Sequence, residues 1–306
     1  MPEPAAPVPA ALTLSELATQ PEMWRRAAAT PEADLARLPK AGERVLVLGC
    51  GTSYYVGEAY ARRRIAAGLG PTRAEIPSQL DHVEDDDVVL VISRSGTTGD
   101  LVRAVEELGG THRVTAIIGE TGTPLADLVP GAVLLEYADE ESVMQTRFAT
   151  TGLSVLRRSL GEDLIAAAKD GEQALTAPLP VEGTAFDELR HVVFLGDKWS
   201  AALCQEAALK IREAAGFWTE AYPLFEYQHG PISCAGPQSL VWAFCDVPDW
   251  VAADIEATGA RLEVGRLDPQ AELVRVHRLA VELALREGRD PDRPPHLSRS
   301  VTLSEG

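Results

Sequence analysis

The chain contains two segments of the same design, each a short apolar run followed by a small loop and a helix-like stretch. Residues 44–49 read R-V-L-V-L-G and lead through C-G-T-S into residues 54–68. Residues 191–196 read H-V-V-F-L-G and lead through D-K-W-S into residues 201–216. Short, almost continuous apolar runs are typical of strands that are buried on both faces of a parallel sheet. The sequence therefore predicts two strand–loop–helix units, one beginning at residue 44 and the other at residue 191.

Strand-like and helix-like patterns alternate between and after these starts. Further strands are expected at residues 87–93, 113–119, 132–137, 240–245 and 261–264, and further helices at residues 14–28, 99–108, 142–160 and 250–258. The alternation predicts two doubly wound parallel-sheet lobes in tandem, each an αβα sandwich of flavodoxin-like type. The expected division is a leader and helix at residues 1–40, a first lobe at 41–165 and a second lobe with a C-terminal tail at 185–306. A tract rich in Gly, Pro and Ala at residues 170–184 is the expected link.

Composition argues against several classes of partner. The 306 residues include 28 Lys and Arg against 46 Asp and Glu, a formal charge of −18, which opposes sequence-independent binding to nucleic acid. No uncharged apolar run approaches the roughly 18 residues that cross a bilayer, and the N-terminal residues lack the basic start of a secretion signal. The four cysteines, none in C-x-x-C spacing, favour a reducing compartment. We expect a cytoplasmic protein without metal, cofactor, nucleic-acid or membrane partner.

Two loops rich in small hydroxyl residues follow strands of the first predicted lobe. They are G-C-G-T-S at residues 49–53 and S-R-S-G-T-T at residues 93–98. Both leave a strand at its carboxyl end, where open parallel sheets form a ligand crevice. Either loop alone could be an ordinary turn with a Ser or Thr cap, but the pair favours a phosphate monoester held by backbone N–H groups and hydroxyls. The loops lack the Lys of a Walker A motif and the G-x-G-x-x-G spacing, which disfavours nucleoside triphosphates and dinucleotides.

Candidate catalytic groups lie in the second predicted lobe. Lys210 and Glu213 are three residues apart on a predicted helix, so both project from one face. His229 follows in a Y-Q-H-G-P loop. An aldose–ketose interconversion needs an acid/base near the ring oxygen and a carboxylate aimed at C2. By spacing alone, such residues are more often a solvated helix pair and an ordinary loop histidine.

Five ordered segments together resemble one family. G-C-G-T-S, I-S-R-S-G-T-T, E-E-S-V-M-Q-T-R, Q-E-A-A-L-K-I-R-E and Y-Q-H-G-P follow one another as in the SIS (sugar isomerase) family. The order resembles the isomerase half of glucosamine-6-phosphate synthase and stand-alone amino-sugar-phosphate isomerase and deaminase relatives. The similarity runs from about residue 13 to the end, where L-S-R-S-V-T resembles the closing segment of that half.

The resemblance implies a set of site residues and a homodimer whose active site is shared between subunits. The residues implied to hold the 6-phosphate are Gly51, Thr52, Ser53, Ser93, Arg94, Ser95 and Thr98, with Arg94 in place of the usual Gln and its backbone N–H as the contact. The residues implied to line the sugar are Cys50, Glu140, Val143, Gln145 and Ser298. Glu213 is implied to carry the proton between C2 and C1, and Lys210 to hold Glu213 and favour the enolate oxygen. His229 is implied to open the ring in the neighbouring subunit's site.

Two departures from the family pattern leave the reaction open. Arg299 stands where the synthase carries a lysine that opens a ketose ring through its amine; an arginine stays protonated and forms no imine, although it can clamp an oxygen or a carboxylate. The chain also begins almost where the isomerase half begins, and both features weigh against ammonia transfer from glutamine. The expectation is isomerisation of glucosamine or N-acetylglucosamine 6-phosphate, with or without deamination. The alternatives are a lyase that removes water from N-acetylglucosamine 6-phosphate, and a non-catalytic sugar-phosphate sensor.

Overall fold

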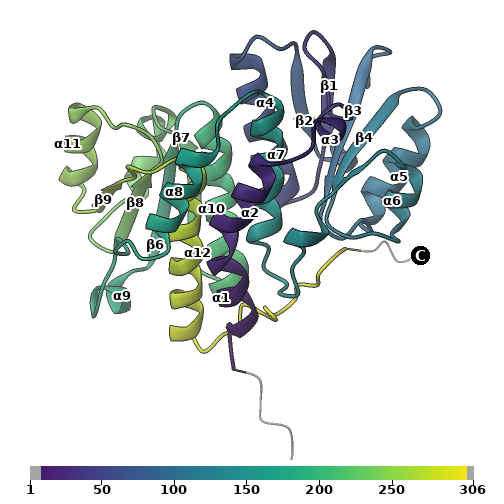
Figure 1. Cartoon of the computed structure of the whole chain (residues 1–306). Coiled ribbons are helices and arrows are strands. Elements are labelled where there is room, and N and C mark those ends of the chain that lie inside the picture. The colour runs from purple at the N-terminus through teal and green to yellow at the C-terminus, as the bar shows by residue number, and fades with distance from the viewer. Residues whose placement is uncertain (1–7, 302–306) are drawn as a thin grey trace, which may run out of the picture.

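The computed structural model describes residues 8–301, which form two parallel sheets (Figure 1). The first sheet has the strand order β2-β1-β3-β4-β5, and all its neighbouring strands are parallel. Its strands are β1 (Arg44–Leu48), β2 (Thr72–Glu75), β3 (Asp87–Ser93), β4 (Arg113–Ile118) and β5 (Val133–Leu134). The order reverses between β1 and β3, as in doubly wound sheets of the flavodoxin type. The predicted α/β architecture is confirmed, and a ligand crevice is expected at the carboxyl ends of these two strands.

The second sheet repeats the arrangement with one strand fewer. Its order is β7-β6-β8-β9, again parallel throughout, and it reverses between β6 and β8. Its strands are β6 (His191–Gly196), β7 (Thr219–Pro223), β8 (Ser239–Ala243) and β9 (Arg261–Val264). Figure 1 shows the two sheets on opposite sides of a central group of helices.

Twelve α-helices and four short 3-10 turns complete residues 8–301. The helices are α1 (Ala11–Ala18), α2 (Gln20–Ala28), α3 (Glu32–Leu35), α4 (Thr52–Ala66), α5 (Gly99–Leu108), α6 (Pro124–Leu128), α7 (Arg147–Ser159), α8 (Ile165–Ala174), α9 (Ala185–Glu188), α10 (Trp199–Ala215), α11 (Asp249–Ala257) and α12 (Pro269–Arg286). The 3-10 turns are Pro77–Gln79, Glu136–Ala138, Glu226–His229 and Pro231–Cys234. No helix within residues 8–301 is long and apolar enough to cross a membrane.

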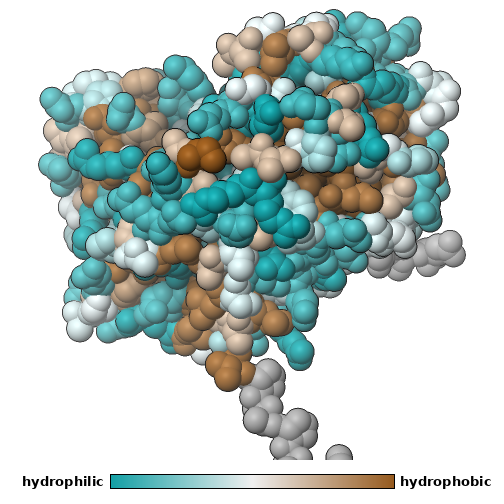
Figure 2. All heavy atoms as spheres, in the orientation of Figure 1, coloured by the Kyte–Doolittle hydropathy of each residue, from teal (hydrophilic) through white to brown (hydrophobic). Residues whose placement is uncertain are grey.

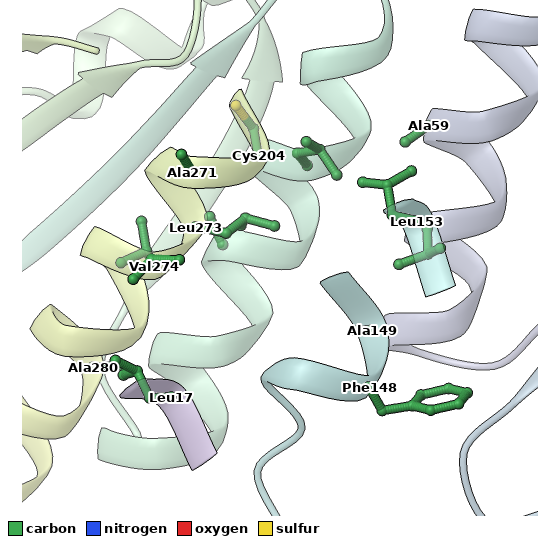
Figure 3. Packing of buried hydrophobic residues seen from close by; sticks show 14 of the residues in the cluster. Leu17, Ala59, Phe148, Ala149, Leu153, Cys204, Ala271, Leu273, Val274 and Ala280 are labelled. Atoms are coloured by element: carbon green, nitrogen blue, oxygen red, sulfur yellow. The ribbon is translucent and has the colours of Figure 1, made fainter. Parts of the chain in front are cut away.

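One hydrophobic cluster joins the two sheets through the central helices. It contains Val47 of the first sheet and Phe194 of the second, and both side chains are fully buried. Figure 3 shows residues of this cluster, among them Leu153 on α7, Cys204 on α10 and Val274 on α12. Separate clusters cover the outer faces: α5 and α6 pack on the first sheet and α11 on the second. Helices therefore cover both faces of each sheet, and the inner helices are shared.

The surface agrees with the acidic composition. Figure 2 shows hydrophilic residues over most of the visible face, with apolar residues concentrated toward its lower end. Val8, just before α1, is 71% exposed, and Leu14 within α1 is 44% exposed. The start of the described chain therefore exposes apolar side chains.

Several expected elements differ from the structure for identifiable reasons. The strand expected at 132–137 is only the two-residue β5, because a 3-10 turn begins at Glu136. The helix expected from residue 142 begins at Arg147, since residues 139–146 form a loop. The expected linker 170–184 is helical up to Ala174, because α8 extends into it. Gly171 of α8 packs against the ring of Trp24. The division into 1–40, 41–165 and 185–306 remains a prediction.

The helix α12 is missing from the expected elements, although its start carries a clear sequence signal. Pro269 occupies the first turn, and the Asp268 side chain accepts a hydrogen bond from the backbone N–H of Gln270 at 2.9 Å. An Asp cap followed by Pro is a typical helix start. The helix spans 18 residues and contributes much of the shared core.

Candidate active site

A cavity of about 320 Å³ lies where the carboxyl ends of β1 and β3 meet α10 and the C-terminal segment. It is lined by Cys50, Gly51, Thr52, Arg94, Thr98, Asp100, Val143, Gln145, Lys210, Glu213, Leu297, Ser298, Arg299, Ser300 and Val301. The cavity thus brings together residues predicted separately as phosphate-binding, sugar-lining and catalytic. Ser53, Ser93, Ser95, Glu140 and His229 are not among the lining residues.

The first phosphate loop enters α4 through Gly51, whose φ of +53° belongs to the region that side chains rarely adopt. The 15-residue α4 then begins at Thr52, and the N–H groups of Ser53 and Tyr54 in its first turn donate to the Cys50 and Gly51 carbonyls at 3.1 and 3.0 Å. Cys50 also lines the cavity, and burial raises the pKa of its thiol to about 11. A thiol of this kind stays protonated near neutral pH.

The second phosphate loop is a tight turn held by its own hydroxyls. The Ser93 Oγ accepts a hydrogen bond from the Gly96 N–H at 3.1 Å, and the Ser95 Oγ accepts one from the Thr97 N–H at 3.3 Å. Gly96 has a φ of +63°, and a Cβ added there would lie 2.0 Å from the Thr123 Oγ1. Ser53, Ser93 and Ser95 are each less than 8% exposed and lie behind the lining residues.

The side chain of Arg94 ties three segments together. Its guanidinium donates to the backbone carbonyls of Ser142 at 2.9 Å, Val143 at 3.4 Å and Arg299 at 2.7 Å. Only 2% of Arg94 is exposed, and burial lowers its pKa from the usual arginine value. The charge is therefore directed at backbone carbonyls of residues 142–143 and of Arg299, and a phosphate contact through the Arg94 backbone stays a prediction.

The loop before α7 places its predicted residues in two different environments. Val143 and Gln145 line the cavity, and the Oε1 of Gln145 is buried without a hydrogen-bond partner among residues 8–301. Glu140 is 1% exposed and instead accepts hydrogen bonds from the backbone N–H groups of Thr146 at 2.6 Å and Arg147 at 2.8 Å. It stabilises the start of α7, where a carboxylate is favoured by the helix dipole.

The predicted catalytic pair forms on α10. The Lys210 Nζ lies 2.5 Å from the Glu213 Oε2 and 3.5 Å from the Glu206 Oε1. The Lys210 side chain is 1% exposed and that of Glu213 is 21% exposed. Burial alone would lower the pKa of Lys210, but attraction to Glu206 and Glu213 outweighs it and raises the pKa above the usual value. A permanently charged lysine thus holds a partly exposed carboxylate at the cavity wall.

The C-terminal segment 297–301 closes one side of the cavity. The Gly99 N–H donates to the Val301 carbonyl at 3.2 Å, in addition to the bond from Arg94 to the Arg299 carbonyl. The Arg299 guanidinium lies 2.6 Å from Asp139 and 2.9 Å from Glu120. The side chain predicted to clamp a substrate oxygen is thus paired with two carboxylates of the protein, while Ser298 lines the cavity.

His229 lies outside the cavity of its own chain. It ends the 3-10 turn Glu226–His229, is exposed, and precedes Gly230 with a φ of +138°. The prediction that it acts in the site of a second subunit stays a prediction.

Four residues that line the cavity were not indicated by the sequence, namely Asp100, Leu297, Ser300 and Val301. Within residues 8–301 no group of three or more His, Cys, Asp or Glu side chains could hold a metal ion.

Comparison with known proteins supports the resemblance inferred from the motifs. Residues 38–157 match the profile of the SIS domain, a stretch that includes the whole first sheet. The chain is 28% identical over 317 aligned positions to a glutamine–fructose-6-phosphate aminotransferase (isomerizing) of Aeropyrum pernix, covering 85% of this chain and 51% of that protein. An enzyme of the same name from Xylella fastidiosa is also 28% identical, at 85% and 52% coverage. The chain spans about half the length of these relatives.

Solved structures share the fold over almost the entire chain. Glucosamine-6-phosphate deaminase from Thermotoga maritima superposes with a TM-score of 0.83 at 21% identity, covering 96% of this chain and 100% of that chain. Tagatose-6-phosphate ketose/aldose isomerase from Escherichia coli gives a TM-score of 0.76 at 19% identity, covering 93% and 96%. At these identities the likeness establishes the shared fold.

Proposed function

Because this chain carries a SIS domain at residues 38–157, we propose that it is an enzyme acting on an amino-sugar 6-phosphate of the glucosamine or N-acetylglucosamine type. The reaction opens the sugar ring, removes the proton at C2 and returns it at C1, with or without release of ammonia. One observation carries the proposal. The Glu213 carboxylate, held by Lys210 at 2.5 Å, lines the same cavity as Gly51, Thr52 and Thr98 of the two phosphate loops.

The phosphate is proposed to lie at the starts of α4 and α5. These helices have 15 and 10 residues and begin directly after the two loops. The positive dipole end of each helix attracts an anion locally, so the net charge of −18 is no obstacle. The hydroxyl protons of Ser93 and Ser95 remain available, because in their own turn these oxygens act as acceptors.

The chemistry is proposed to take place between Glu213 and the open-chain sugar. A Glu213 oxygen takes the proton from C2, the C–H electron pair forms the C1–C2 double bond of an enediol-type intermediate, and the C1–O π pair moves to O1, which takes a proton. Where C2 bears a hydroxyl, Glu213 returns the proton to C1 and the C2 hydroxyl loses its proton, which gives the 2-ketose. If C2 bears a free amine, reprotonation at C1 leaves an imine at C2, and water replaces it with release of ammonia. Lys210 keeps Glu213 in place and offsets its charge.

Ring opening is proposed to need a second copy of the chain. No histidine is among the residues that line the cavity within 8–301, and His229 is exposed on a turn. This placement supports a homodimer in which His229 of the partner subunit completes the site. Mixing an inactive Glu213→Gln dimer with an inactive His229→Ala dimer should restore part of the activity after subunit exchange. Mixtures that stay inactive while mixed dimers form would contradict a shared site.

The proposed function is tested by hydrogen exchange at C2. The protein is incubated in deuterated water with glucosamine 6-phosphate, N-acetylglucosamine 6-phosphate or fructose 6-phosphate, and deuterium in the sugar is located by NMR. We expect exchange at C2 of at least one aldose phosphate and none with unphosphorylated glucosamine, the matched control. Binding of all three phosphates without any exchange would contradict an enzyme and favour the sensor alternative.

Product masses then separate the reactions that share C2 deprotonation. With fructose 6-phosphate, an unchanged mass and a new aldose signal identify isomerisation, and free ammonia together with a new ketose from glucosamine 6-phosphate identifies deamination. Loss of one water from N-acetylglucosamine 6-phosphate identifies the lyase alternative.

A further inference from the structure

We propose that Glu206 is a positioning residue that holds Lys210 charged while Glu213 carries the substrate proton. The proposal rests on the proposed function and adds to it the group that balances charge during proton transfer. Glu206 lies one turn before Lys210 on α10 and is not among the residues that line the cavity.

The geometry joins Glu206 to both halves of the site. Its Oε1 lies 3.5 Å from the Lys210 Nζ and accepts a hydrogen bond from the Thr52 Oγ1 at 3.3 Å. Only 1% of Glu206 is exposed, and its Oε2 is buried without a hydrogen-bond partner among residues 8–301. Thr52 belongs to the first phosphate loop and begins α4. Glu206 therefore connects the phosphate-binding helix with the lysine that holds the proposed base.

Among residues 8–301, the surroundings of the Glu206 carboxylate offer only one cation within contact distance, Lys210. The titratable and charged groups that act on Glu206 or Lys210 are Glu213 and Lys210 on α10, Tyr55 on α4, His277 on α12 and Glu140 in the loop before α7. Burial lowers the pKa of His277 to about 3, with a further contribution from Lys210, so this histidine is neutral. Within the described part of the chain, Lys210 thus faces two carboxylates and no second positive charge at contact distance.

Charge balance gives Glu206 its role. Before the reaction, the charge of Lys210 is offset mainly by Glu213, whose carboxylate is the closer partner. When Glu213 accepts the proton from C2, it becomes neutral and Lys210 loses that partner. An unpaired buried cation is strongly unfavourable, and the ionised Glu206 carboxylate supplies the remaining negative charge. Proton transfer to Glu213 is therefore easier when Glu206 is ionised than when it is protonated.

Burial also makes this role sensitive to pH. Removal from water raises the pKa of Glu206 to about 7, although Lys210 acts in the opposite direction. As the pH falls through this value, Glu206 gains a proton and no longer balances Lys210. The exchange rate at C2 should then decrease, whereas a purely structural tie between α4 and α10 would produce no such step.

The Glu206→Gln variant is the test, because it keeps the size of the side chain and removes the charge. The rate of deuterium exchange at C2 is measured from pH 5.5 to 9 with saturating sugar phosphate. We expect wild type to show a rise centred near pH 7, and the variant to lack it and be about tenfold slower at pH 8. The KM should change by no more than about twofold, since Glu206 touches no cavity surface. A variant with the same rise as wild type overturns the proposal.

Two further measurements keep the test decisive. If Glu206→Gln fails to fold, Glu206→Asp is measured instead. This variant keeps the charge, so its exchange rate must still show the rise near pH 7. A folded Glu206→Asp variant without this rise also overturns the proposal. The infrared band of a protonated carboxylic acid should appear in wild type as the pH falls through about 7, and be absent from Glu206→Gln. No such difference band overturns the proposal independently of turnover. A wild type that shows this band but exchanges no sugar refutes the proposed function instead.

Discussion

The neutral histidine behind Lys210 gives a quantitative prediction for stability. His277 on α12 is 1% exposed, its Nδ1 lies 3.1 Å from the Gln20 Nε2, and its Nε2 has no partner among residues 8–301. Burial first, and then the charge of Lys210, lower its pKa to about 3 from an ordinary value of 6.5. Protonation of this ring in the folded protein would place a second cation beside Lys210.

The size of the effect follows from the two pKa values. Because the folded pKa of His277 is depressed, its contribution to stability is complete above pH 6.5 and is lost as the pH falls toward 3. At pH 5, His277 is protonated in the unfolded chain but not in the folded protein. This pH lies about 1.5 units below the ordinary histidine pKa of 6.5. One unit corresponds to about 1.4 kcal/mol, so acidification from pH 7.5 to 5 costs about 2 kcal/mol at this residue.

The assay compares wild type with His277→Gln, which keeps a partner for Gln20 but does not titrate. Free energies of unfolding are measured with urea at pH 7.5 and pH 5. The wild-type value relative to the variant should fall by about 2 kcal/mol at the lower pH. The comparison is needed because the pKa of Glu206 is raised to about 7, so proton uptake there stabilises both folded proteins on acidification. An identical difference at both pH values would refute the reasoning.

Three substitutions test other parts of the site. Gly96→Ala should weaken phosphate binding at least about tenfold, because the added Cβ would lie 2.0 Å from the Thr123 Oγ1. Binding of the sugar phosphate is measured by calorimetry. Gly122→Ala is the control, because Gly122 has a similar φ but open space around it, so it shows the effect of backbone strain without a collision. Glu140→Ala should lower the free energy of unfolding by about 1–2 kcal/mol through loss of a helix cap; unchanged stability with a raised KM would instead indicate sugar contact. Arg299→Gln should raise KM severalfold, because it releases the C-terminal segment 297–301 from the cavity. The free energy of unfolding should fall by less than about 1 kcal/mol, since the side chains of the ion pair are about a third exposed. An unchanged KM would argue against a role of this segment in closing the cavity.

The sequence predicts the central strands and the loops well because their signals are local, whereas the edge strands β2 and β7 are not among the expected elements. The runs at residues 44–49, 87–93 and 191–196 are continuous apolar segments, and the structure places β1, β3 and β6 on them. A parallel sheet sends consecutive loops to its carboxyl edge, so the two small-residue loops meet once the order is doubly wound. Their convergence on one cavity therefore follows from topology.

Features that depend on tertiary contacts could not be predicted in the same way. Glu140 belongs to a sugar-lining motif by resemblance, yet its carboxylate turns back onto the backbone N–H groups of α7, which no residue pattern reveals. Glu206 stands four residues before Lys210, so spacing could have added it to the pair. Its complete burial and its contact with Thr52 arise only from the packing of α10 on α4.

The most direct measurement for the whole account is ligand binding and C2 exchange in one Glu213→Gln preparation. The variant keeps the phosphate loops and the shape of the cavity but lacks the proposed base. Titration calorimetry with the sugar phosphate that wild type exchanges should give a dissociation constant within about threefold of wild type. Deuterium exchange at C2 should fall by a factor on the order of a thousand. Exchange at the wild-type rate in the variant would show that another group removes the proton and would contradict the account.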